Sequence, residues 1–149
     1  MTGTKIDGKN IAQTVKDRVK KSASELKKDG INPCLATVLV GNNTASATYV
    51  RNKHKACEEV GIITKDHKLD ENTTQQQLSS IIDELNADAT VHGILVQLPL
   101  PKHLSEFATT SRISPLKDVD GLTPHNCRII SNGKSSTCSM HSIRSNGNV

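Results

Sequence analysis

Apolar residues recur along the chain with two alternating patterns, one typical of amphipathic helices and the other of buried strands. Residues 11–26 carry apolar side chains at helical spacing, and Gly30 ends that helix. The apolar run 34–40 is short and rich in branched residues, which predicts a buried strand. Thr74 and Gln77 have the spacing of a capping box. The same alternation predicts further helices at 46–60, 74–85 and 103–113, a strand that begins at 62, and a strand at 91–98.

Strands that alternate with helices predict an α/β fold of three layers, in which a mostly parallel sheet has helices on both faces. The length of 149 residues suits one domain. In such sheets, ligands bind beyond the carboxyl ends of the strands. Here those ends are Gly41 with the turn after it, and Gln97 with Pro99. The pattern therefore points to two segments as parts of a ligand site.

The composition argues against several classes of function. Tyr49 and Phe107 are the only aromatic residues, so a domain that stacks nucleic-acid bases on aromatic rings is not expected. The net charge is +4, and lysines clustered at 20, 21, 27 and 28 indicate a solvated helix face, or else a weak attraction for anions. Four cysteines and six histidines are scattered without the spacing of a metal site. The chain has no signal peptide or membrane-length apolar run, so we expect a cytoplasmic protein without a membrane partner. The scattered cysteines and histidines and the few aromatic residues likewise lead us to expect neither a metal nor a nucleic-acid partner.

The segment after Gly41 is the first candidate for chemistry. Tyr49 and Lys53 are one helical turn apart, and Ser46 precedes them on the same stripe of the predicted helix. A lysine held beside a phenol at the end of a strand could exchange protons near neutral pH. The alternative is a surface lysine beside a half-buried tyrosine.

Two further segments carry polar residues that could contact a ligand. Gln97 ends a buried strand, where its amide could position a ligand or merely mark the exit of the strand. Asp118, Asp120 and Gly121 suit a tight loop that offers carboxylates to the amino groups of a ligand. Loops rich in Asp and Gly are also common as ordinary turns.

Together these segments resemble the bifunctional methylenetetrahydrofolate dehydrogenase/methenyltetrahydrofolate cyclohydrolase family. The resemblance runs from about Lys5 to about Lys134 in the order and spacing of that family. We therefore expect residues 1–126 to form the folate-binding catalytic domain of the family. The matching blocks are Ile6-Asp7-Gly8-Lys9, the Ser46/Tyr49/Lys53 run, and the segments 55–62, 93–101 and 117–122.

The resemblance implies two reactions of one-carbon folate metabolism. One moves a hydride from methylenetetrahydrofolate to NADP or NAD. The other adds water to the resulting methenyltetrahydrofolate and opens it to formyltetrahydrofolate. The resemblance also implies that the full-length family protein is a homodimer with a folate as its small-molecule partner.

The resemblance further implies roles for individual residues. The catalytic residues are Lys53, Tyr49 and Gln97. Lys53 would handle protons in the hydrolysis, and Gln97 would hydrogen-bond Lys53 and help to set its charge state. Tyr49 would pack along the folate, and Asp120 would hold the pterin ring through its amino groups. The substrate-binding residues are Tyr49, Ser46, Gln97, Leu98, Pro99 and Asp120.

The carboxyl end of the chain departs from the family. Gly-x-Gly-x-x-Gly occurs nowhere, so we expect the second, Rossmann-type domain of the family to be absent from these 149 residues. The family's Pro-Cys-Thr-Pro segment is replaced by Thr137-Cys138-Ser139-Met140. When the sequence is translated one base later, suitable codons restore Pro-Cys-Thr-Pro-Phe-Gly. We therefore expect residues 127–149 to be a divergent tail produced by truncation or a frameshift, which sequencing of the locus would test.

Two other interpretations use the same residues. Short-chain dehydrogenases also have Ser followed by Tyr-x-x-x-Lys, but they need a glycine-rich dinucleotide loop before the tyrosine. Only about one helix and one strand are predicted before Tyr49, which argues against that family. A catalytically silent folate-binding or interaction domain would keep the same residues without turnover. Hydrolysis of methenyltetrahydrofolate by the purified chain separates this alternative from an enzyme.

Overall fold

The computed structural model describes residues 7–127, and its helices and strands alternate as the apolar pattern predicts. The elements are α1 (Gly8–Lys28), β1 (Cys34–Val40), α2 (Thr44–Val60), β2 (Ile63–Leu69), α3 (Gln75–Ala87), β3 (Gly93–Val96) and α4 (Glu106–Arg112). A further helical turn lies at 124–127. Apart from Cys127, the tail predicted for 127–149 lies outside the described residues. None of the helices in the described part is long and apolar enough to cross a membrane.

β1 lies at the centre of a parallel sheet whose strand order is β2-β1-β3. The registers place Thr37 of β1 between Asp66 of β2 and Leu95 of β3. Beyond β3, Asp118 forms a single parallel bridge with Ile94, so a short segment extends the sheet on that side. The prediction of a mostly parallel sheet is confirmed.

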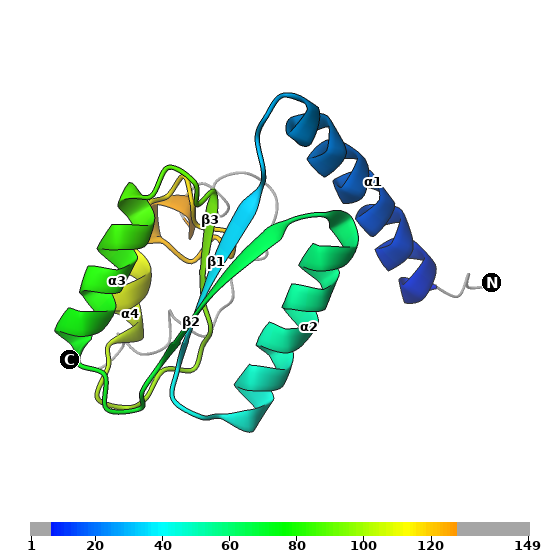
Figure 1. Cartoon of the computed structure of the whole chain (residues 1–149). Helices are drawn as coiled ribbons and strands as arrows, with labels where there is room; N and C mark the ends of the chain where they lie inside the picture. The colour runs from blue at the N-terminus through cyan, green and yellow to red at the C-terminus, as the bar shows by residue number, and fades with distance from the viewer. Residues whose placement is uncertain (1–6, 128–149) are drawn as a thin grey trace.

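Helices cover both faces of the sheet, as predicted. α3 and α4 lie on one face and α2 lies on the other, with α1 packed outside α2 (Figure 1). Because successive residues of a strand point to opposite faces, alternate residues of β1 join the main core. That core consists of Cys34, Ala36, Val38, Val40, Leu78, Ile82, Leu85, Val91, Ile94, Val96, Leu100, Leu104 and Ile113.

The start of each helix is set by a side chain that accepts N–H groups of the first turn. Asp7, Asn43 and Ser105 cap α1, α2 and α4 in this way. Thr74 and Gln77 form the predicted capping box of α3, with both reciprocal hydrogen bonds present. The cap residue of α2, Asn43, lies two residues after Gly41, so the helix begins at the carboxyl edge of the sheet.

α1 is a helix, as its apolar spacing predicts, but much of its apolar stripe is exposed. Ala23 is the only buried residue of α1. Ile11 and Val15 are 55% and 45% exposed. The Lys16–Glu59 ion pair joins α1 to the carboxyl end of α2. Figure 1 shows the amino-terminal half of α1 extending away from the other helices.

Candidate functional site

Three neighbouring segments end at the same edge of the sheet, and each leads to a residue predicted from the sequence. β1 leads through Gly41 into α2, β3 leads into Gln97, and the segment bridged to Ile94 leads into Asp120. The Gln97 N–H donates to Val38 O at 2.9 Å, which fixes Gln97 beside the end of β1. The topology therefore gathers the three predicted segments on adjacent parts of one sheet edge.

α2 carries three of the predicted residues, and they differ in exposure. Helical side chains lean toward the amino end of their helix, so Tyr49 and Lys53 lean toward this sheet edge. Tyr49 is 64% exposed and Lys53 is partly buried. Ser46 is only 3% exposed, and its N–H donates to Asn43 Oδ1 at 3.1 Å. Ser46 thus belongs to the first turn of α2 and presents little surface to a ligand in this conformation.

The side chain of Lys53 makes no hydrogen bond or ion pair with other groups in residues 7–127, so its amino group is available to a ligand. The charge of Lys53 acts on the thiol of Cys57, which lies one turn further along α2. Burial raises the pKa of the Cys57 thiol, and the positive charge of Lys53 partly opposes that rise. The predicted hydrogen bond between Lys53 and Gln97 is not formed in this conformation and stays a prediction.

The side chain of Gln97 is satisfied at one end only. Its Nε2 donates to Leu98 O at 2.8 Å, whereas Oε1 is buried and accepts no hydrogen bond. Leaving a buried polar group unpaired typically costs about 1–3 kcal/mol. The site is therefore suited to a donor, from a ligand or a lysine, that approaches Oε1. Leu98 and Pro99 follow, joined by a cis peptide bond, and Pro99 is exposed.

The two aspartates of the third segment have different environments. Asp118 accepts hydrogen bonds from Leu122 N, Thr123 N and Asn126 Nδ2 at 3.3, 2.8 and 3.0 Å. Burial alone would raise the pKa of Asp118, but these donors outweigh it and hold the pKa below its ordinary value. Asp120 is exposed and makes no such bond within the described chain. Asp118 thus shapes the loop, and Asp120 presents a free carboxylate.

Lys117 and Gly93 fix where this loop lies. Lys117 Nζ donates to the carbonyl oxygens of residues 85, 86 and 88 at 3.0, 2.8 and 2.7 Å, which ties the loop to the carboxyl end of α3. Lys117 O accepts from Ile94 N at 2.7 Å. A Cβ on Gly93 would come within 2.6 Å of Val119 Cγ1. The sequence singled out Asp120, but the supporting roles of Lys117, Asp118 and Gly93 come from contacts that no local pattern signals.

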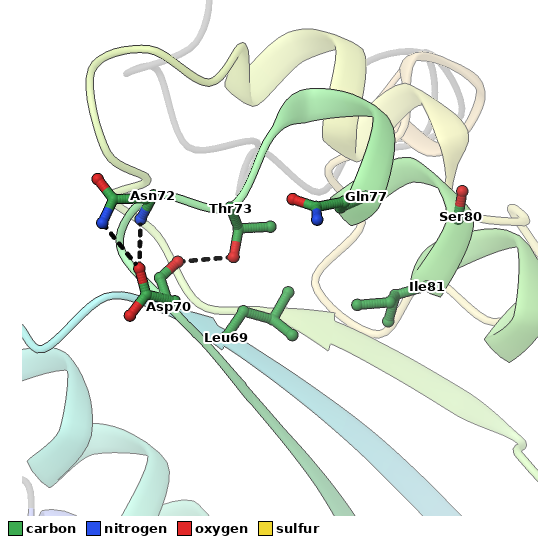
Figure 2. Close-up of a pocket in the computed structure, with 7 residues that line it drawn as sticks. All are labelled: Leu69, Asp70, Asn72, Thr73, Gln77, Ser80 and Ile81. Carbon is green, nitrogen blue, oxygen red and sulfur yellow. Dashed lines mark hydrogen bonds between the residues drawn. The ribbon is translucent and has the colours of Figure 1, made fainter.

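Two hollows open at this edge of the sheet. One, of about 360 Å³, lies between the turn after β1 and the loop after β3, and Pro99 is part of its lining. The other, of about 500 Å³, lies between the end of β2 and the start of α3 (Figure 2). Figure 2 shows Asn72 donating twice to Asp70 Oδ1, and Thr73 Oγ1 donating to Asp70 O. Neither hollow is lined by a basic side chain, and the larger one is lined by no predicted site residue, so the smaller one, which includes Pro99, is the better candidate.

The described residues contain no group of three or more His, Cys, Asp or Glu side chains that could hold a metal ion. The groups they do offer are a lysine, an amide oxygen without a donor, an exposed phenol ring and a free carboxylate. Such a set can bind a flat ligand rich in N–H groups and can transfer protons beside it.

An α/β domain with these groups at the carboxyl edge of a parallel sheet belongs to the class of small-molecule-binding α/β proteins. Residues 6–120 match the family described as "Tetrahydrofolate dehydrogenase/cyclohydrolase, catalytic domain". The chain belongs to this family, which confirms the resemblance inferred from its motifs.

Relatives and solved structures agree with this assignment. The Bifunctional protein FolD of Nitrosopumilus maritimus is 77% identical over 130 residues, covering 87% of this chain and 45% of the relative. The Bifunctional protein FolD of Cenarchaeum symbiosum is 59% identical over 128 residues, covering 86% and 45%. The crystal structure of the bifunctional enzyme FolD from Campylobacter jejuni superposes with a TM-score of 0.84 at 47% identity, covering 87% of this chain and 46% of that one. The chain thus spans about half the length of the curated relatives that it matches.

Proposed function

We propose that this domain binds a folate and hydrolyses methenyltetrahydrofolate to formyltetrahydrofolate, as part of one-carbon metabolism. The observation that supports the proposal is that α2, which carries Lys53, the end of β3 at Gln97 and the loop with Asp120 are reached from neighbouring segments of one sheet edge, with Gln97 Oε1 buried and without a donor. Family membership supports the same activity. We further propose the cytoplasm as the compartment, and a homodimer as the assembly of the longer family proteins.

Substrate binding falls to groups that have no competing partner. The free carboxylate of Asp120 can accept hydrogen bonds from the amino and ring N–H groups of a pterin. The exposed ring of Tyr49 offers a flat surface for the aromatic part of a folate. Leu98 and Pro99 would supply apolar contact beside Gln97; Pro99 lines the smaller hollow, and Leu98 is half-buried against the core. These groups would hold the substrate so that its reactive carbon lies near Lys53.

The chemistry is an addition of water followed by cleavage of a carbon–nitrogen bond. The water oxygen attacks the cationic methenyl carbon between N5 and N10, and the water releases a proton. The bond to N5 then breaks while the second water proton leaves and the formyl C=O forms on N10. One proton ends on N5 and the other in solvent. Lys53, in its neutral form, would accept the first proton and deliver it to N5, while Gln97 Oε1 accepts an N–H of Lys53 and holds it in place.

A nicotinamide cofactor belongs to the dehydrogenase reaction of the family. In the solved structure from Trypanosoma brucei, 34% identical with a TM-score of 0.81, NADP is bound together with an inhibitor. Here the turn from β1 to α2 has one glycine, Gly41, and the Asn43 side chain already accepts the N–H of Ser46 in the first turn of the helix. This turn does not fit the pyrophosphate of a dinucleotide, so we assign no step of hydride transfer to the described residues.

Hydrolysis by the purified 149-residue chain tests the proposal. Methenyltetrahydrofolate is mixed with the chain, and its disappearance is followed against the rate in buffer alone. Saturable acceleration is the expected result, and Lys53→Ala should remove it. If the chain binds the substrate by calorimetry but gives no acceleration, the alternative of a silent folate-binding domain replaces the enzyme. If the chain does not bind the substrate, both proposals fail.

A further inference from the structure

A polar cluster outside the candidate site ties α2 to two strands. His54 of α2 places Nε2 2.7 Å from Asp66 Oδ1 of β2. Thr37 Oγ1 of β1 donates to the same carboxylate oxygen at 2.7 Å, and it also lies 3.2 Å from His54 Nε2. Either the imidazolium or the neutral ring with its proton on Nε2 can donate to Asp66. We call these three residues the His54 clasp.

The His54 clasp constrains the rotation of α2, a helix that buries few apolar side chains. Val50 and Val60 are the buried apolar residues of α2. Apolar contact is non-directional, so two valines set the rotation of α2 about its own axis only loosely. Hydrogen bonds weaken steeply when their angle is wrong. The clasp therefore specifies how α2 is turned on the sheet.

The clasp contributes more to geometry than to stability. The side chains of His54 and Asp66 are 23% and 51% exposed. Ion pairs that solvent reaches to this extent contribute little net free energy of folding. Thr37, by contrast, is buried, with only 2% of its surface exposed. The Asp66 carboxylate is therefore hydrogen-bonded to a side chain that has little freedom to move. Breaking the His54 contact should leave the domain folded and α2 less well oriented.

We propose that His54 is a positioning residue for Lys53, an inference that rests on the proposed function. Lys53 and His54 are neighbours on α2 and stand about 100° apart around its axis. Side chains reach about 5–6 Å from a helix axis, so a rotation of about 20° displaces them by about 2 Å. A misplacement of about 1 Å can cost on the order of a hundredfold in rate. The clasp holds Lys53 at the angle from which it can serve the substrate beside Gln97.

Kinetics of matched variants of the 149-residue chain test the proposal. His54→Leu and Asp66→Ala should each lower kcat for methenyltetrahydrofolate hydrolysis by about tenfold to a hundredfold, with KM changed much less. The double variant should lose no more than either single variant, because both remove the same contact. His54→Gln keeps an N–H donor at a similar reach and should restore most of the rate. Lys55→Ala, on the exposed side of α2, is the control and should leave kcat unchanged.

Residual dipolar couplings of α2 amides, measured against those of β1, report helix orientation without any substrate. We expect them to change in His54→Leu and to return toward parent values in His54→Gln. If the folded His54→Leu variant keeps both the parent couplings and the parent kcat, the positioning role is overturned. If the parent chain does not hydrolyse the substrate, the proposed function fails, and the couplings alone decide whether His54 orients α2.

Discussion

Val119 lies directly against the bare Cα of Gly93, so close that a Cβ on Gly93 would stand 2.6 Å from Val119 Cγ1. Valine is stiff about its first side-chain torsion, so the contact cannot be relieved by a simple swing of the side chain. The loop that carries Asp120 lies beside β3. It can approach the strand this closely because Gly93 has no side chain.

Gly93→Ala should push this loop away from β3. We expect a loss of about 1–3 kcal/mol in the free energy of unfolding, the usual cost of overpacking a close contact. Folate binding should weaken as well, because Asp120 would be displaced. Denaturant unfolding and calorimetry measure the two effects. Gly8→Ala is the matched control, since no atom lies within 4 Å of its added Cβ; a loss as large in Gly8→Ala would remove the steric explanation.

Lys53→Ala should abolish hydrolysis of methenyltetrahydrofolate while the domain stays folded. Removal of a positioned proton-transfer group lowers the rate by on the order of a hundredfold or more. The rate of hydrolysis and the circular dichroism of the variant check both parts. Lys55→Ala is the control: Lys55 lies on the exposed side of α2, and its removal should keep the parent rate. Equal rates for Lys53→Ala and the parent would exclude Lys53 as the catalytic lysine.

Substitution of Asp120 should affect folate binding, whereas substitution of Asp118 should affect the stability of the fold. Asp120→Ala should weaken folate binding strongly and leave unfolding unchanged, because its carboxylate is exposed and unbonded in the described chain. Asp118→Ala leaves three N–H donors without an acceptor, so we expect about 1–3 kcal/mol of destabilisation. Calorimetry and denaturant unfolding of both variants measure the difference. The opposite pattern would exchange the two roles.

The pKa of Asp118 also predicts a dependence of stability on pH. Because its pKa is lower in the folded chain, the carboxylate contributes stability above the ordinary value of 3.8, and this is lost as pH falls through the folded pKa. Asp118→Asn should therefore be less stable than the parent at neutral pH, with the gap closing at lower pH. Thermal unfolding from pH 6 to about pH 2 measures the gap. Asp120→Asn is the control from the same loop, and a gap that does not close would contradict this account.

The 149-residue chain by itself should show neither saturable NADP or NAD binding nor oxidation of methylenetetrahydrofolate. The family match covers the catalytic domain, and the single glycine in the turn from β1 to α2 does not build a pyrophosphate site. Hydride transfer requires the nicotinamide to be held against the substrate carbon. Titration with either dinucleotide, followed by fluorescence or calorimetry, is the measurement. A saturable isotherm would show that residues of this chain do bind the cofactor.

The sequence by itself determined the order of the elements, because apolar period and capping side chains act over a few residues. The run 34–40 became β1 at those bounds, and Thr74 with Gln77 formed the capping box before α3. The parallel sheet and its carboxyl edge followed from the alternation of elements. Gly41 and Gln97 could therefore be assigned to one edge from the sequence alone, whereas Asp120 was singled out by its loop and by the family resemblance.

Only the tertiary structure decided which side chains are free and which are held. Asp118 and Asp120 are chemically identical in the sequence, yet only Asp118 faces the N–H groups of residues 122, 123 and 126. The His54 clasp joins residues 17 and 29 positions apart, so no local spacing reveals it. The apolar stripe of α1 predicted a helix, but burial of that stripe needs a facing surface, and α2 meets only part of that helix. These features depend on contacts between elements, which hydrophobic pattern and local propensity do not encode.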